Sequence, residues 1–320
     1  MRSRRWWPTG SVKISERALL RPRVCERSPL VESYQETDVH GRTDYVPYDK
    51  RKLSYANTFP NPWKANTIRA LEWVTGKIPL LRLIRRFERA GLVEGQEFWE
   101  RALNIMGVEL QTPAEQINRI PKTGPLIVVA NHPHGLVDGV ILAELVGRVR
   151  TDYKILTRSL LTGVKEISQF MIPVPFAHED DAQKKNVEMR RRCMEHLASD
   201  GVIILFPSGV VMASETMFGP PIEAEWGVFT AKMVQKSGAT VVPIYFPGAN
   251  SRLYHIANQI SPTIRQGLLL HEVVHSLNKP QYPTVGHPIT PAEIAEWASN
   301  PRGFMAWLRA HTLSLKDGAP

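Results

Sequence analysis

From about residue 110 onward, the hydrophobic positions form two kinds of pattern, short apolar runs and helical periodicity, which alternate along the chain. Short apolar runs rich in β-branched residues predict four buried strands, at residues 125–130, 153–157, 202–206 and 240–246. Helical periodicity predicts helices between them, at residues 138–150, 186–199 and 226–237. Strands that alternate with helices in this way predict an α/β fold, in which a mixed central sheet is flanked by crossover helices.

A further helical pattern precedes the predicted sheet, between residues 65 and 90. It predicts a short helix that Gly76 closes and a second helix that begins near Pro79. At about 100° per residue, one face of the second helix groups the apolar residues Leu80, Leu83, Ile84 and Phe87. Its opposite face groups the arginines Arg82, Arg85, Arg86 and Arg89. Such a helix either packs on the protein core or lies in a membrane interface, with its arginines near lipid phosphates.

These patterns divide the 320 residues into four segments. Residues 1–60 are rich in arginine and then polar, which predicts a basic, poorly ordered extension. Residues 61–109 form the predicted helical membrane-docking segment, and residues 110–290 form the α/β domain. A capping box at Thr290 to Glu293 then introduces residues 291–320, which we interpret as a C-terminal helix and tail.

The balance of charges favours a polyanionic partner. The chain has 40 Lys and Arg against 31 Asp and Glu, a formal net charge of +9, and its pI is about 9.6. Nucleic acid, an anionic membrane surface and a phosphorylated substrate all fit this balance. No nucleic-acid-binding motif accompanies the basic residues, and much of their excess lies in the first 30 residues and on the arginine face of the second helix. We therefore expect a membrane surface with anionic lipids as the partner, and no nucleic acid.

Cysteines and apolar stretches limit the compartment and the class of site. Cys25 and Cys193 lie far apart, without the spacing of a disulfide framework or a structural zinc site. The longest uncharged stretches are too short and too interrupted by Pro and Gly to span a bilayer as a helix. The first residues lack the apolar run of a secretory signal. We expect a cytoplasmic protein without a metal site, peripheral on the inner face of the membrane.

Two histidines and an aspartate follow the first predicted strand: His132, His134 and Asp138. In an open α/β sheet, sites form at the carboxyl ends of strands, and the next helix offers free N–H groups to an anion. A histidine there can remove a hydroxyl proton as the oxygen attacks a carbonyl, while a carboxylate orients the ring. Alternatively, one histidine caps the helix and the other packs. Metal ligation by these three residues lacks a partner cluster, and no Gly-x-Ser-x-Gly sequence supports a serine nucleophile.

Three sequence blocks, taken in order, resemble the glycerolipid acyltransferases of the lysophosphatidic acid acyltransferase type. They are ANHPHGLVDG (130–139), ILFPSG (204–209) and VVPIYF (241–246). The following PGANSRLYH (247–255) is similar to a bacterial branch that includes lyso-ornithine-lipid and hemolysin-like acyltransferases. The resemblance covers about residues 67–290. It implies transfer of a fatty acyl group from acyl-CoA or acyl-carrier protein to the hydroxyl of a lysophospholipid or related lysolipid, with no further cofactor.

The resemblance also implies roles for single residues. His132 corresponds to the general base, because it follows an asparagine as the family's histidine does, and Asp138 corresponds to the aspartate that orients it. His134 remains a rival base. The substrate-binding residues that the blocks imply are Asn131, Gly135, Phe206, Pro207, Ser208 and Gly209.

The chain departs from the family pattern in three places. Five residues, rather than the usual four, separate His132 from Asp138, and Ser208 stands where the family usually has Glu. No arginine follows the second central strand, where the family has a phosphate ligand and where this chain offers His178. Arg158 and Arg252 are the other candidates for positive charge at the site.

These departures keep a second hypothesis open, a catalytically inactive membrane- or lipid-binding module on the same fold. The string HPHG (132–135) also resembles a motif of the diacylglycerol acyltransferases. Those enzymes rank lower here because this sequence lacks their long hydrophobic N-terminal segment.

Overall fold

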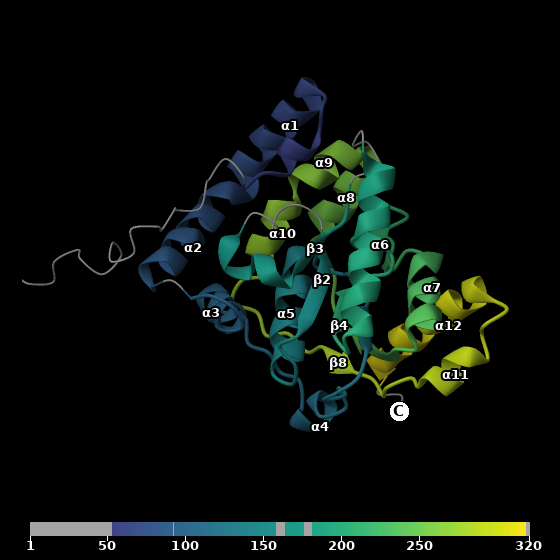
Figure 1. The fold of residues 1–320 in the computed structure, drawn as a ribbon. Helices are drawn as coiled ribbons and strands as arrows, with labels where there is room; N and C mark the ends of the chain where they lie inside the picture. Colours follow the sequence, from purple (N-terminus) through teal and green to yellow (C-terminus); the bar gives the residue numbers. More distant parts are fainter. Residues whose placement is uncertain (1–52, 92, 158–163, 176–180, 318–320) are drawn as a thin grey trace, which may run out of the picture. The chain divides into compact units, whose positions relative to one another are not determined.

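A six-stranded sheet forms the centre of the computed structural model, which describes residues 53–91, 93–157, 164–175 and 181–317 (Figure 1). All of these residues belong to one unit, Asp44–Pro320. The strand order is β3-β2-β4-β1-β7-β8. The strands are β1 Leu126–Ala130, β2 Tyr153–Thr157, β3 Met171–Pro173, β4 Val202–Leu205, β7 Thr240–Tyr245 and β8 Thr284–Val285. Only the β7–β8 pair of this sheet is antiparallel, so the predicted mixed α/β sheet is confirmed.

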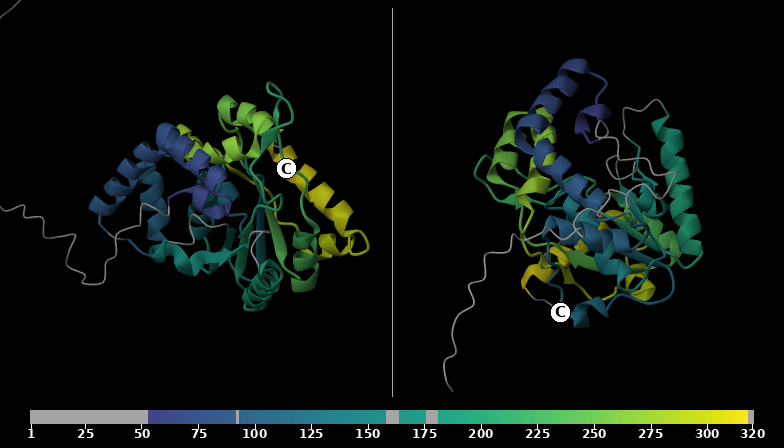
Figure 2. Two further views of the ribbon diagram at one scale, coloured as in Figure 1. Left: turned by 90° about the horizontal axis from the view of Figure 1, so that it is seen from above. Right: turned by 90° about the vertical axis from the view of Figure 1, so that its left-hand side faces the viewer.

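Alternate residues of β1 serve two separate cores, one on each face of the sheet. Leu126, Val128 and Ala130 pack with α5 (Leu136–Gly147) and α3 (Glu97–Met106). Ile127 and Val129 pack with α6 (Ala182–Ala198), α7 (Val228–Ser237) and α12 (Pro301–Ser314). Both faces are therefore covered by helices (Figure 2), which explains why β1 reads as a continuous apolar run rather than an alternating one.

All four predicted strands and all three predicted helices of the sheet region are present, with ends that differ by a few residues. The sequence analysis missed β3, β8 and a small separate hairpin of β5 (Ala213–Ser214) and β6 (Pro221–Ile222). Two or three residues are too few for a recognisable period. The remaining elements are η1 Tyr55–Thr58, α4 Ala114–Ile117, η4 Lys165–Phe170, α8 Arg252–Ile260, α9 Pro262–Gly267, α10 Leu269–His275, α11 Pro291–Ala295 and η5 Leu315–Asp317.

The predicted break at Gly76 is wrong, because the helix continues through it. Helix α1 (Pro62–Glu72) runs through a π-helical turn, η2 (Trp73–Lys77), into α2 (Ile78–Arg89). A Cβ atom at position 76 would lie 2.6 Å from the backbone nitrogen of His271 in α10. Glycine stands here because α10 approaches the η2 backbone closely, not because a helix ends.

The apolar face of α2 also requires a correction. Leu80 is only 5% exposed, and Leu83 and Ile84 pack against the core cluster that contains it. The ring of Phe87 lies 4.8 Å from that of Phe98 in α3. Of the two alternatives left open for this helix, its apolar face therefore packs on the protein core, and the expected contact of that face with lipid is wrong. An amphipathic stripe does not reveal which apolar phase buries it. The four arginines of the opposite face, Arg82, Arg85, Arg86 and Arg89, are exposed.

Within the part of the chain that the structure describes, no helix is long and apolar enough to cross a membrane. The capping box is confirmed at the start of α11, where Glu293 accepts from Thr290 N at 2.7 Å and Thr290 Oγ1 accepts from Glu293 N at 3.4 Å.

Candidate active site

The loop between β1 and α5 holds the two histidines at the carboxyl end of a central strand. Gly135, at φ +75° and ψ −123°, turns the chain directly into α5. Such a positive φ is strained for residues with a side chain. The carbonyl of His132 accepts from Met212 N at 2.8 Å, which ties the loop to the segment after β4. Parallel pairing of β1 with β4 thus brings residues 131–138 and 206–212 to one edge of the sheet.

Asp138 holds both histidines with one carboxylate. Its Oδ2 lies 3.0 Å from His132 Nδ1 and its Oδ1 lies 3.0 Å from His134 Nδ1. Oδ2 also accepts from the backbone N–H groups of His134 at 2.8 Å and Gly135 at 3.1 Å. Burial alone would raise the pKa of Asp138, which is fully buried, but the two histidines and their hydrogen bonds outweigh it and the pKa is lowered. The carboxylate is therefore held charged.

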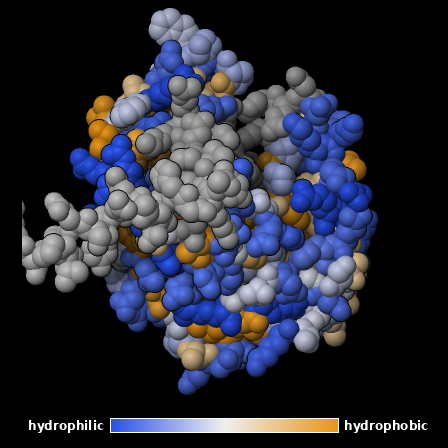
Figure 3. Space-filling view, turned by 60° about the vertical axis from the view of Figure 1, so that its left-hand side comes forward, coloured by the Kyte–Doolittle hydropathy of each residue, from blue (hydrophilic) through white to orange (hydrophobic). Residues whose placement is uncertain are grey.

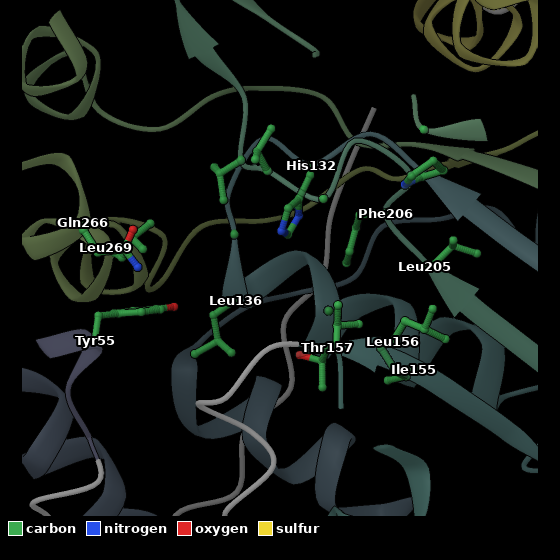
Figure 4. A pocket seen from close by; sticks show the side chains of 18 of the residues that line it. Tyr55, His132, Leu136, Ile155, Leu156, Thr157, Leu205, Phe206, Gln266 and Leu269 are labelled. Atoms are coloured by element: carbon green, nitrogen blue, oxygen red, sulfur yellow. The ribbon is translucent and has the colours of Figure 1, made fainter. Parts of the chain in front are cut away.

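The two histidines differ in their access to the cavity. His132 lines a cavity of about 490 Å³ and stacks on Phe206, with ring centroids 3.8 Å apart (Figure 4). Its Nδ1 faces Asp138, so Nε2 is the ring nitrogen left for a substrate. His134 does not line the cavity, and a Cβ atom at Gly248 would lie 2.9 Å from its Nε2. Access therefore distinguishes His132 from His134, while their distances to Asp138 do not.

The extra residue between His132 and Asp138 does not separate them. The turn at Gly135 folds residues 132–135 back over the first turn of α5, where Asp138 sits at the third helical position. One carboxylate then reaches both rings and two backbone N–H groups.

Asn131 lies behind the cavity rather than in its wall. Its Oδ1 accepts from Phe246 N at 2.7 Å, and its Nδ2 donates to Phe246 O at 2.8 Å. The residue is 1% exposed. Both ends of the amide thus tie the end of β1 to the end of β7, which fixes the loop that carries His132.

The block at residues 206–209 contributes three of its four predicted residues to the cavity. Phe206, Pro207 and Gly209 line it, as does Gly135 from the histidine loop. Ser208 does not, and its hydroxyl donates to the carbonyl of Val210 at 3.0 Å. Its hydroxyl therefore shapes the turn after β4.

Glu223 is a residue of this site that the sequence analysis missed. Its Oε2 accepts from the backbone N–H of His132 at 3.1 Å, and its Oε1 accepts from the indole N–H of Trp226 at 2.9 Å. Glu223 is 2% exposed, and burial raises its pKa against these hydrogen bonds. No local signal marks this residue, because 91 positions separate it from its histidine.

Of the three basic residues considered for the site, the structure describes only Arg252. Arg158 and His178 lie outside the described residues. Arg252 is exposed on α8, donates to Gly219 O at 3.0 Å and does not line the cavity. The cavity wall instead contains Arg265 of α9, which the sequence analysis did not single out. Among the described residues, no group of three or more His, Cys, Asp or Glu is arranged to hold a metal ion.

Comparisons with known proteins indicate the family of this chain. Residues 71–276 match the model of a protein family described as Acyltransferase. A lyso-glycine lipid O-acyltransferase of Bacteroides thetaiotaomicron is 27% identical over 223 residues, which cover 64% of this chain and 78% of that protein. One of Phocaeicola vulgatus is 26% identical over 223 residues, covering 64% and 76%.

A solved structure is also similar, that of the 1-acyl-sn-glycerophosphate (LPA) acyltransferase PlsC from Thermotoga maritima. It has a TM-score of 0.44 and 14% sequence identity, covering 82% of this chain and 85% of that chain. The family assignment does not depend on this structure, because the family model spans well over half of the 320 residues and includes the whole histidine loop. The family expected from the three sequence blocks is confirmed: the chain belongs to the acyltransferase family and is an acyltransferase.

Proposed function

We propose that this acyltransferase esterifies the free hydroxyl of a lysolipid, with His132 as the general base and Asp138 as the residue that orients it. The observation that carries the proposal is the contact of His132 Nδ1 with a buried carboxylate at 3.0 Å while its ring lines the cavity. The two relatives named for a lyso-glycine lipid support a lysolipid acceptor for this chain, and, like the resemblance to the lyso-ornithine-lipid branch, they favour lipids built on an amino acid as candidates.

One histidine can carry out both proton transfers of the reaction. With Nδ1–H donated to Asp138, His132 Nε2 accepts the proton of the acceptor hydroxyl as its oxygen attacks the donor carbonyl. Asp138 stabilises the imidazolium that forms. Collapse of the tetrahedral intermediate breaks the bond between the carbonyl carbon and the leaving group, and His132 returns its proton to that group. We propose a thioester donor, acyl-CoA or acyl-carrier protein, whose thiolate leaves readily and needs no further cofactor.

The oxyanion requires donors that are not already used within the protein. The N–H groups of Gly135 and Gly209 donate to Asp138 Oδ2 and Phe206 O, respectively. The first N–H groups of a helix have no partner inside it. We therefore assign oxyanion stabilisation to the first turn of α5, where Leu136 lines the cavity.

The cavity extends from His132 in two directions, which fits two substrates. One end lies between β2, β4, α6 and α7 and is almost entirely apolar, as its lining of Ile155, Leu156, Val174, Met189, Leu205 and Phe229 shows. The other end reaches η1, α8, α9 and the start of α10, with Tyr55, Gln266 and Leu269 visible in Figure 4. We assign the apolar end to the acyl chain of the donor and the end at α9 to the acceptor head group.

We propose that a membrane surface with anionic lipids delivers the lysolipid, and that η2 and its neighbours contact it. Trp63 is 82% exposed, Trp73 51%, Val74 86% and Ile78 44%. Tryptophan and aliphatic side chains beside exposed arginines are typical of a protein surface that lies at a lipid interface. On the face shown in Figure 3, apolar side chains lie in separate patches among hydrophilic ones, which suits a peripheral contact. Because the proposed thioester donors are cytosolic, we propose that this contact is on the inner face of the membrane.

The direct test supplies purified protein with a thioester donor and a panel of lysolipids, and follows both products. Each molecule of esterified lipid seen by mass spectrometry should be matched by one free thiol. The alternative of an inactive lipid-binding module predicts binding to vesicles without thiol release. Absence of thiol release with every donor and acceptor pair would overturn the proposed function. The retained contact of His132 with Asp138 favours the enzyme over the inactive module.

A further inference from the structure

Arg265 stands out among the residues that line the cavity. It is the only lysine or arginine among the described lining residues, and none of them is Asp or Glu. Its side chain comes from α9, outside all of the sequence blocks that pointed to the family. A single positive charge in an otherwise neutral part of a cavity wall favours an anionic ligand.

The guanidinium of Arg265 has N–H donors available for a ligand. Its Nη1 donates to Asn258 Oδ1 in α8 at 2.8 Å, and none of the described carboxylates forms an ion pair with it. Because guanidinium carries five N–H donors, one bond to a neutral amide positions the group without neutralising it. Arg265 is half-buried, so a ligand ion would meet it partly shielded from water, where a charge-assisted bond is stronger.

The neighbours of Arg265 add neutral donors rather than further charge. Tyr254 is 2% exposed, and burial raises its pKa to about 12 although Arg265 opposes this. Its phenol is therefore protonated under ordinary conditions. Gln266 lines the same end of the cavity. The planar fork of arginine can bind a carboxylate or a phosphate through two parallel hydrogen bonds. The single cation, beside a neutral phenol and a neutral amide, balances the one charge of a carboxylate but not the charge of about −1.5 to −2 on a phosphate monoester.

We propose that Arg265 binds the carboxylate of the acceptor's head group, so that the enzyme selects lysolipids that carry a free carboxylate. The inference rests on the proposed function, because it names the acceptor of the same cavity. It makes Arg265 a residue that determines specificity rather than one that takes part in proton transfer. Its loss should raise the KM for the acceptor and leave the donor KM unchanged.

The test compares an N-(3-hydroxyacyl)glycine with the matching N-(3-hydroxyacyl)ethanolamine, which has the same acyl chain but no carboxylate, and with lysophosphatidic acid as a phosphate-bearing acceptor. For the two amide acceptors, only product esterified on the 3-hydroxyl is counted, because the ethanolamine group carries a hydroxyl of its own. Wild type should prefer the glycine acceptor in kcat/KM. Arg265→Met should lower kcat/KM for that acceptor by about 10- to 100-fold, the usual size of a lost hydrogen bond to a charged group. Arg265→Lys should recover part of the loss. Arg302→Met, at an exposed position of α12 outside the cavity, is the matched control and should change nothing.

Retained turnover of the ethanolamine acceptor by Arg265→Met shows that the variant is folded and catalytically intact. Equal losses on both amide acceptors, a change confined to the donor KM, or a preference of wild type for lysophosphatidic acid would each overturn the assignment. If wild type transfers to none of these three acceptors but to another lysolipid of the panel, the inference fails and the proposed function stands, whereas transfer to no lysolipid at all overturns both. If it transfers to the glycine and ethanolamine acceptors equally, only the inference fails.

Discussion

The two sides of the Asp138 carboxylate offer a controlled comparison within one molecule. Each oxygen lies 3.0 Å from the Nδ1 of a histidine. On one side the ring of His132 reaches the cavity and stacks on Phe206. On the other side the ring of His134 ends against the backbone of Gly248. An aspartate–histidine contact therefore does not identify a general base, whereas access of the second ring nitrogen to substrate does.

The largest effect should follow from removing the charge that both sides share. Asp138→Asn keeps the shape of the side chain but cannot stabilise an imidazolium, and its amide favours the wrong tautomer of His132. We expect kcat to fall about 10³- to 10⁴-fold, as for the aspartate of a hydrolytic triad. Thiol release in single-turnover assays measures this. A loss of less than about 10-fold, with the fold intact by circular dichroism, would show that the carboxylate is structural only.

A smaller effect should come from disturbing the His132 side alone. In Glu223→Gln, one of the two acceptor oxygens becomes a donor, so the side chain keeps either the His132 N–H or the Trp226 indole as partner but not both. We expect kcat to fall about 10-fold through misplacement of the base, with the acceptor KM unchanged. Measured kcat and KM values separate this positioning role from a binding role, which would change KM instead.

The matched disturbance on the His134 side is Gly248→Ala. Its φ of +90° disfavours a side chain, and the new Cβ would lie 2.9 Å from His134 Nε2. We expect the free energy of unfolding to drop by about 1–3 kcal/mol, seen as a lower Tm. The kcat measured well below that Tm should stay within about threefold of wild type. A kcat loss larger than that of Glu223→Gln would reverse the roles of the two sides.

The sequence predicted where His132, His134 and Asp138 lie in the fold better than it predicted what covers the helices before them. Periodicity and β-branched runs predicted the four main strands, and the position of His132, His134 and Asp138 directly after the first of them predicted their place at the carboxyl end of the sheet. The sequence did not predict the partners that complete the site. Glu223 and Phe246 lie 91 and 115 positions from the loop residues that they bind, and only the three-dimensional fold brings them together. The cation of the cavity, Arg265, carries no motif at all.

The amphipathic helix α2 failed as a predictor for a different physical reason. Its apolar stripe was identified correctly, but the stripe carries no information on whether protein or lipid covers it. In the structure, Leu80 belongs to the core, while Trp73 and Val74 of η2 are exposed. The arginine face, by contrast, is solvent-exposed as its charge requires.

The contrast between the buried apolar face of α2 and the exposed residues of η2 gives the smallest expected effect on catalysis. Val74→Asp should reduce binding to anionic vesicles about 10-fold, because it places a negative charge on the exposed surface, and it should leave turnover of detergent-dispersed lysolipid unchanged. Leu80→Ala should instead cost about 2–4 kcal/mol of the free energy of unfolding and leave vesicle binding of the folded protein intact. Vesicle co-sedimentation and thermal unfolding distinguish the two outcomes. The reverse pattern would restore the lipid assignment of the α2 apolar face.

The most direct test of the central claim is a side-by-side measurement of His132→Ala and His134→Ala in the same single-turnover transfer assay. If His132 is the base, its variant should lose at least about 10³-fold in rate, while His134→Ala should keep a rate within about 10-fold of wild type and be less stable. Near wild-type transfer by His132→Ala, or a deeper loss in His134→Ala with its fold intact, would contradict the assignment of the base to the cavity side of Asp138.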